Sequence, residues 1–147
     1  MKSISRRDLR VLLPALAAMN VDAQQQPAGG VAPLTSKVYQ NSAVPYRGAG
    51  EKKGRRFFFG TNRSSFALEM HETILPAGTE THPPHKHPHE EIVIVMDGTL
   101  DVYIEGKIEK AEAGSVAYIA TNEMHNMKSA GSGPARYCVI ELRATAS

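Results

Sequence analysis

The stretch from His82 to Gly98, written HPPHKHPHEEIVIVMDG, constrains this chain more than any other part of it. It holds four of the six histidines and two adjacent glutamates, and it runs directly into an apolar segment. Side chains alternate between the two faces of an extended strand. His85 and His87 therefore point the same way, about 6–7 Å apart along the backbone. Two neutral imidazoles on one face can bind a divalent metal ion.

Glu91 follows at the same parity, but a straight strand would carry it roughly 13 Å beyond His87, too far for a shared ion. The chain must therefore turn within residues 88–90, which begin with a proline that cannot donate to a sheet ladder. Glu91 then opens a buried strand over residues 92–96. The pair Asp97-Gly98 predicts a hairpin turn at the end of that strand.

Only His71 and His125 lie outside this stretch. In residues 66–74 apolar and polar side chains alternate, and His71 falls on the polar side, which predicts an exposed histidine rather than a ligand. His125 follows a glycine turn at Gly114, a short strand over residues 115–119 and a tight turn. That order would place His125 on the same side of the folded chain as His85 and His87.

These two segments resemble the two motifs of the cupin family. The first motif, over residues 78–98, is a glycine, a spacer, His-x-His, a glutamate and a second glycine, matched here by Gly78, His85, His87, Glu91 and Gly98. The second motif, over residues 114–129, keeps its glycine and its histidine at Gly114 and His125. It departs from the family where proline, glycine and asparagine are usual, at Ala120, Asn122 and Ser129. Asn122 is a mild change because asparagine tolerates a left-handed turn.

The resemblance implies an all-β fold, a single jelly-roll β-barrel, over residues 51–147. It also implies that His85, His87, Glu91 and His125 bind one divalent transition metal. These ligands would leave one or two open positions for water or substrate, and they do not choose among Mn, Fe, Ni, Cu and Zn. The strand pattern agrees with the fold, because short strands separated by turn signals are typical of a sandwich or barrel.

Cupins with this ligand set include dioxygenases, decarboxylases, isomerases and sugar-binding modules. We expect a metal-dependent, dioxygenase-like enzyme that acts on a small organic substrate. The alternatives are a non-catalytic module that binds a small molecule or sugar, and a cupin isomerase. Tyr103, Tyr118 and Glu123 are candidates for acid–base roles, with structural packing as the simpler interpretation of each.

The remaining residues of the histidine stretch receive no ligand role from the pattern. His89 lies in the expected turn, where it would point away from the site, and His82 precedes two prolines in a loop. Either histidine could hydrogen-bond to a metal ligand without contacting the metal itself. Glu90 faces the opposite side of the strand from Glu91.

The N-terminus resembles a bacterial export signal. Ser5-Arg6-Arg7-Asp8-Leu9 is similar to the twin-arginine signature, and the apolar segment over residues 11–19 is too short to span a bilayer. Small residues precede a cleavage point at Gln24. We therefore predict that residues 1–23 form a signal peptide and that the protein is exported to the periplasm or outside the cell. No stable membrane insertion is expected after cleavage.

Removal of residues 1–23 would take away four basic and two acidic side chains. Because the net charge of the whole chain is +2, the mature chain would be nearly neutral. A nucleic-acid-binding protein needs a basic face, so none is expected here. Cys138 is the only cysteine, and it is predicted to be a buried apolar side chain rather than a nucleophile.

Residues 24–50 are predicted to be a linker, QQQPAGG, followed by an extended arm or edge strand. The cupin resemblance suggests that such an arm pairs with a second protomer, which would make a homodimer. The charged segment EKKGRR at residues 51–56 predicts a solvated turn, and residues 57–60 predict the first strand of the barrel.

Overall fold

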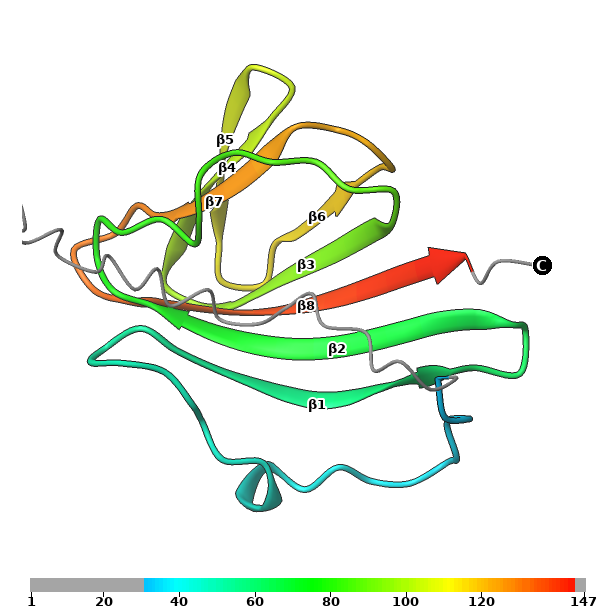
Figure 1. The fold of residues 1–147 in the computed structure, drawn as a ribbon. Helices are drawn as coiled ribbons and strands as arrows, with labels where there is room; N and C mark the ends of the chain where they lie inside the picture. Colours follow the sequence, from blue (N-terminus) through cyan, green and yellow to red (C-terminus); the bar gives the residue numbers. More distant parts are fainter. Residues whose placement is uncertain (1–30, 145–147) are drawn as a thin grey trace, which may run out of the picture.

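The computed structural model describes residues 31–144, which form one β-rich unit (Figure 1). The predicted signal at residues 1–23 and the linker up to residue 30 lie outside the described residues. The elements are η1 (Asn41–Ala43), β1 (Lys53–Thr61), β2 (Phe66–Leu75), β3 (Glu90–Asp97), β4 (Thr99–Ile104), β5 (Lys107–Glu112), β6 (Val116–Ile119), β7 (His125–Ser129) and β8 (Ala135–Ala144). Over residues 31–144, no helix is long and apolar enough to cross a membrane.

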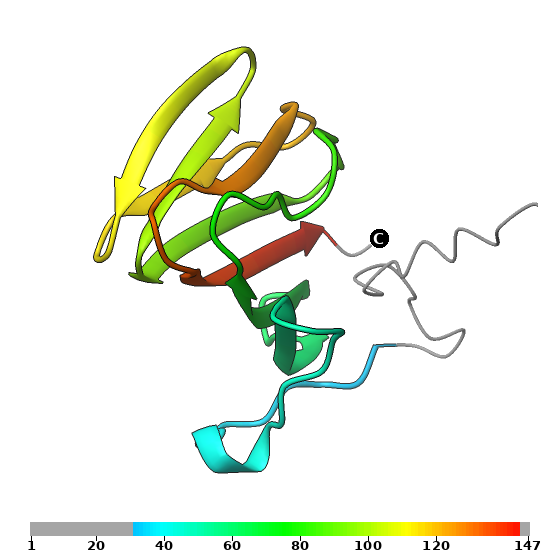
Figure 2. The same cartoon turned by 90° about the vertical axis from the view of Figure 1, so that its left-hand side faces the viewer.

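The strands form two antiparallel sheets that face each other. One sheet has the order β1-β2-β8-β3-β6, and the other has the order β5-β4-β7. Figure 1 shows the long, curved strands of the first sheet on one side and the shorter strands of the second sheet across from them; Figure 2 gives the same arrangement from the side. This is the jelly-roll architecture that the sequence predicts.

The space between the sheets is apolar at one end and polar at the other. Along β3, Val93 and Val95 point inward into a core with Leu100, Ile119 and Tyr137. Glu91, two residues before Val93 on the same face, is also buried, with 6% of its surface exposed. Because one face of one strand carries both kinds of residue, the core ends where the polar site begins.

The turn at Gly98 differs from the prediction. Gly98 has a positive φ of 75°, as a tight turn requires, but β3 and β4 belong to different sheets and are not hydrogen-bonded partners. The predicted hairpin at Asp97-Gly98 is therefore wrong: the chain crosses there from one sheet to the other. The next hairpin joins β4 to β5 through Glu105 and Gly106, which both have positive φ.

The first strand begins earlier than the sequence indicates. Residues 53–56 belong to β1 and not to a solvated turn. Arg55 is nearly buried because it pairs with Glu72 at 2.6 Å and packs against the rings of Tyr46 and Phe57. The two arginines of EKKGRR are thus paired with glutamates of β2, a pairing that local composition does not reveal.

The arm is extended and pairs with its own protomer. Leu34 donates its N–H to the carbonyl of Thr61 at 2.8 Å, and Arg47 and Gly54 exchange hydrogen bonds at 2.8 Å each. Arg55 donates to the carbonyls of Asn41 and Val44 at 3.1 and 3.3 Å. These contacts fix the arm against β1 within one chain.

The facing of β2 is opposite to the prediction. The strand itself is confirmed, but Ala67, Glu69 and Glu72 are buried whereas Phe66 is 44% exposed. Glu69 and Glu72 lie on opposite faces, and each is buried by its pairing with arginine, Arg56 for the first and Arg55 for the second. Ion pairing therefore buries a glutamate on each face of β2, so the apolar alternation alone does not predict burial on this strand.

Two glycines with similar φ allow a matched test of the sheet crossing. A Cβ at Gly98 would lie 2.5 Å from the carbonyl oxygen of Pro134, whereas a Cβ at Gly78 meets nothing within 4 Å. Both substitutions to alanine cost about 1–2 kcal/mol of left-handed strain. We expect Gly98→Ala to lower the free energy of unfolding clearly more than Gly78→Ala in urea titrations. Equal losses would contradict a close backbone contact at the crossing.

Candidate metal centre

The loop between β2 and β3 carries His85 and His87 and runs beside β7, which it meets at isolated bridges from Glu80 to Lys128 and from His85 to His125. His85 donates its N–H to the carbonyl of His125 at 3.1 Å and accepts the N–H of His125 at 2.8 Å. This double exchange makes the two residues a directly opposed antiparallel pair, whose side chains leave the same face. The chain then bends at residues 88–89, as predicted, and β3 begins at Glu90.

The turn before β7 fixes the backbone of His87. Asn122 has φ 61°, the left-handed conformation that the sequence anticipates at this position. Its N–H donates to the carbonyl of His87 at 2.8 Å. The side chain of Glu123 accepts the N–H of Ala120 at 3.0 Å, so this glutamate stabilises the turn. The segment before β7 therefore fixes the backbone of the histidine-rich loop, in addition to the hydrogen bonds between His85 and His125.

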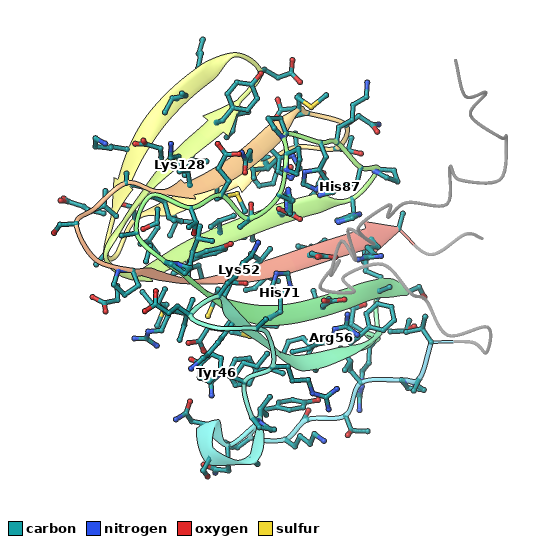
Figure 3. The ribbon with its side chains drawn as sticks, turned by 60° about the vertical axis from the view of Figure 1, so that its left-hand side comes forward. Tyr46, Lys52, Arg56, His71, His87 and Lys128 are labelled. Atoms are coloured by element: carbon teal, nitrogen blue, oxygen red, sulfur yellow. The ribbon has the colours of Figure 1, made fainter. Side chains whose placement is uncertain are left out.

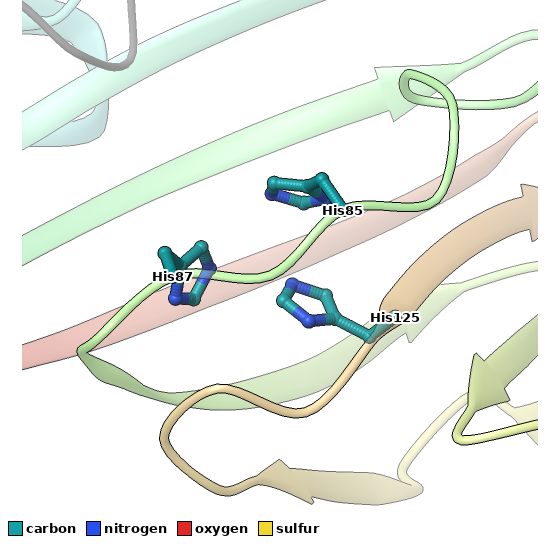
Figure 4. A group of neighbouring side chains, drawn as sticks. All are labelled: His85, His87 and His125. Carbon is teal, nitrogen blue, oxygen red and sulfur yellow. The ribbon is translucent and has the colours of Figure 1, made fainter.

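Three imidazole rings meet where these segments join (Figure 4). One ligand atom from each of His85, His87 and His125 lies within 4.8 Å of the other two. Glu91 completes the group, with Oε1 2.9 Å from His87 Nε2 and Oε2 3.5 Å from His125 Nε2. The structure thus brings together all four residues that the sequence singles out.

Backbone carbonyls set the protonation of two of the rings. His87 Nδ1 lies 3.0 Å from the carbonyl oxygen of His89, and His125 Nδ1 lies 2.8 Å from that of Glu123. A carbonyl only accepts, so each Nδ1 carries the proton and donates it. His125 Nε2 then faces the site without a hydrogen-bond partner, whereas His87 Nε2 is hydrogen-bonded to Glu91 Oε1 and would exchange that bond for one to a metal; a ring held through Nδ1 is typical of ligating histidines.

Several atoms of the group have no hydrogen-bond partner in the part of the chain that the structure describes. These buried atoms are His85 Nδ1, His125 Nε2 and Glu91 Oε2. Buried polar atoms without partners cost free energy, and a cation bound among these three would satisfy all of them. The 2.9 Å between His87 Nε2 and Glu91 Oε1 is close to the spacing of about 3 Å between neighbouring ligands at metal bond lengths near 2.1 Å. The residues present fit a divalent ion.

The charges of the group follow from burial and from Glu91. Burial lowers the pKa of His85 to about 4, and the neighbouring histidines add to the effect. Burial also opposes the charged form of His87, but the hydrogen bond and charge of Glu91 outweigh it and raise the pKa of His87. Burial acts against the charge of Glu91 too, yet the bond to His87 and the nearby histidines lower its pKa. The carboxylate is therefore ionised, as a ligand must be.

The sequence predicts that His89 points away from the site, but the structure places its ring beside that of His87. It is only 7% exposed, and its ring stacks on that of His87 with centroids 3.4 Å apart and planes 3° apart. Its Nε2 lies 3.3 Å from Glu141 Oε2. The bend at residues 88–89 turns the side chain inward, because Glu141 on β8 offers a buried acceptor.

His71 is also placed differently from the prediction. Its side chain is only 23% exposed, and Nδ1 lies 3.4 Å from Glu69 Oε1 and 3.9 Å from Glu141 Oε1. Figure 3 shows His71 on β2 and Arg56 on neighbouring β1. A second group of His and Glu side chains thus continues along the sheet from Glu91. Glu69 and Glu141 are not identifiable as site residues from the sequence, where their one signal is a charged residue within an otherwise strand-like run.

The other residues considered from the sequence lie outside the group. Tyr118 is 57% exposed, and His82 is an exposed loop residue whose ring packs edge-on against His85 at 4.0 Å. Tyr103 pairs with Asn126 between β4 and β7. Cys138 is buried on β8, as predicted.

Comparisons with known proteins agree with this fold. Residues 71–141 match the family model described as a cupin domain. Similar solved structures include an RmlC-like cupin from Shewanella frigidimarina, with a TM-score of 0.62 and 17% identity over 75% of this chain and 93% of that one. KdgF from a Halomonas species has a TM-score of 0.63 and 14% identity, over 74% of this chain and 96% of that one. A predicted oxalate decarboxylase from Thermotoga maritima has a TM-score of 0.60 and 16% identity, over 73% of this chain and 99% of that one.

None of the curated proteins matches the chain. Residues 71–141 match a cupin domain, and the structural neighbours share the jelly-roll fold of this chain. Its His and Glu groups could hold a metal ion.

Metal affinity should fall in acid. Because the pKa of His87 is raised above 6.5, this ring binds a proton below that pH, and an incoming ion must displace the proton. We expect the dissociation constant for Zn²⁺ to rise about tenfold per pH unit below the pKa for each displaced proton. His85, with a pKa of about 4, adds no competition until the solution is much more acidic. Chelator competition from pH 5 to 8 measures the slope, and an affinity that stays constant from pH 5 to 7 would contradict it.

Proposed function

We propose that this protein is a metal-dependent enzyme of the cupin superfamily, dioxygenase-like, that acts on a small organic substrate. His85, His87, Glu91 and His125 would hold one divalent transition metal, with Mn, Fe, Ni, Cu and Zn all compatible with the ligand set. The observation that carries the proposal is the close approach of the three imidazoles to one another and of Glu91 to His87 and His125. In the described residues, His85, His125 and Glu91 each have a buried atom without a hydrogen-bond partner.

The chain's own residues would orient the ion and leave room beside it. The carbonyls of His89 and Glu123 fix the two rings in the form that exposes Nε2. His125, His87 and Glu91 are buried, whereas His85 is only partly buried, so the group meets solvent on the side of His85. Three nitrogens and one carboxylate leave one or two positions for a substrate or dioxygen, which a bound divalent ion polarises or activates.

Two alternatives use the same site. One is a non-catalytic module whose ion orients a small molecule or sugar, and the other is a cupin isomerase. Structural neighbours include a polyketide cyclase from Streptomyces resistomycificus as well as the predicted decarboxylase, so this fold is compatible with several reactions.

Metal content provides the first test of the site. His125→Ala and Glu91→Gln should each lower bound metal from about one equivalent to a small fraction, because each removes a ligand. His82→Ala is the matched control, since this loop histidine lies beside His85 but outside the ligand group, and it should retain the metal. Full metal content in His125→Ala would overturn the site.

Oxygen uptake then separates the functions. Iron- or manganese-loaded protein should consume oxygen with some member of a panel of phenols, flavonols and diketones, and His125→Ala should not. Ligand-dependent thermal shifts without oxygen uptake would instead support the binding module, and conversion of an aldose or ketose without oxygen would support the isomerase.

We also propose that the chain is exported through its twin-arginine-like segment and that it forms a homodimer. Replacement of Arg6 and Arg7 by lysine should stop export, whereas Arg10→Lys, outside the pair, should not. Mass spectrometry of periplasmic protein should give a chain that begins at Gln24, and sedimentation should give twice the mass of one mature chain. Uncleaved protein confined to the cytoplasm, or a monomer in sedimentation, would contradict the respective proposal.

A further inference from the structure

Three carboxylates lie in one row across the inner face of the larger sheet. Glu69 is directly opposite Glu141 in the pairing of β2 with β8, and Glu141 is directly opposite Glu91 in the pairing of β8 with β3. All three are buried, with exposures of 3%, 3% and 6%. Like charges that oppose each other across strands destabilise a sheet, so this row requires positive partners.

Two guanidinium groups supply most of the compensation. Arg143 binds Glu141 Oε2 through Nε at 3.0 Å and through Nη2, and Arg56 Nε lies 3.0 Å from Glu69 Oε1. Three carboxylates against two guanidiniums leave one negative charge, which belongs to Glu91 at the metal centre. With the histidines neutral, a divalent ion bound there would leave this wall with one positive charge, which favours an anionic ligand.

Arg143 is held in a position suited to such a carboxylate. Glu141 fixes one edge of its guanidinium, which lies over the ring of Phe59 at 5.8 Å. The side chain is 19% exposed, and in residues 31–144 no partner contacts its Nη1. An arginine oriented in this way offers its remaining N–H groups to a carboxylate without first losing side-chain freedom.

The spacing relates Arg143 to the metal centre. Arg143 lies two residues beyond Glu141 on the same face of β8, roughly 6–7 Å along the strand. Glu91 is one strand away from Glu141, about 4.8 Å across the sheet. A small molecule that reaches from the ion to Arg143 would therefore span roughly 8 Å, the length of a short carbon chain with a polar group at each end.

We propose that Arg143 binds the carboxylate of an acidic small-molecule substrate whose other end lies at the metal centre. This inference rests on the proposed metal-dependent function and adds the substrate class. Against an apolar substrate the wall of carboxylates and guanidiniums would lose water without gaining partners, so the site favours a charged, polar molecule. The competing interpretation is that Arg143 only neutralises Glu141.

Binding of matched acids and esters by the metal-loaded protein tests the proposal. The probes are glutarate and adipate, each compared with its monomethyl ester, which removes one carboxylate but keeps the length. Calorimetry should give at least about tenfold tighter binding of one diacid than of its ester, because a charge-assisted pair is lost with the ester. Arg143→Gln should bind the acid and the ester within about twofold of each other.

Arg136→Gln is the matched control. Arg136 lies on the same strand but on the outer face, where it pairs with Glu72 at 3.4 Å, so the preference for the diacid should persist. If Arg143→Gln does not fold, Arg143→Lys replaces it, and the preference should fall at least several-fold because lysine lacks the planar fork.

The outcomes separate this inference from the function on which it rests. Metal content is measured in every sample, and wild-type protein that binds no metal contradicts the metal centre itself. Wild-type protein that holds metal but binds acid and ester equally, or Arg143→Gln that retains the preference, overturns the role of Arg143 and leaves the metal centre intact.

Discussion

The paired backbone hydrogen bonds between His85 and His125 are the interaction on which the site depends. They join a loop that leaves β2 to a strand that belongs to the opposite sheet, about forty residues later in the chain. Without this pairing, the histidine-rich loop would be a long connection over the barrel mouth. With it, the loop becomes part of the sheet, and the alternation of side chains turns His85, His87 and His125 toward Glu91.

The site also depends on how the sheet tolerates buried charge. A jelly roll normally fills its interior with apolar side chains, and the part of this barrel around Val93 and Leu100 does so. At the other end, glutamates and histidines take those inward positions, and arginines from two strands balance them. The candidate metal site is thus one end of a charged wall that crosses the sheet, and the wall makes the space beside that site polar and charged.

The sequence predicts the main strands and the four converging residues well, for physical reasons. Short apolar runs between glycine and proline turns determine the strands, and the His-x-His spacing with a forced turn determines where Glu91 returns. The facing of β2 could not be predicted, because Glu69 and Glu72 are buried by arginines on another strand. His89 was misplaced for the same kind of reason, since its partner Glu141 lies far away in the sequence. Local patterns report hydrophobicity, whereas these positions are decided by long-range ion pairs.

The bend at Asn122 has a consequence for how the protein could handle different ions. Its N–H holds the backbone of His87, and the carbonyls of His89 and Glu123 hold two of the rings, so the ligand geometry is set by the main chain. These main-chain hydrogen bonds do not require a bound ion, unlike the structure of a zinc finger, which folds around its metal. The bound ion would be exchangeable, and the metals that the cell supplies during loading would determine which ion the site holds.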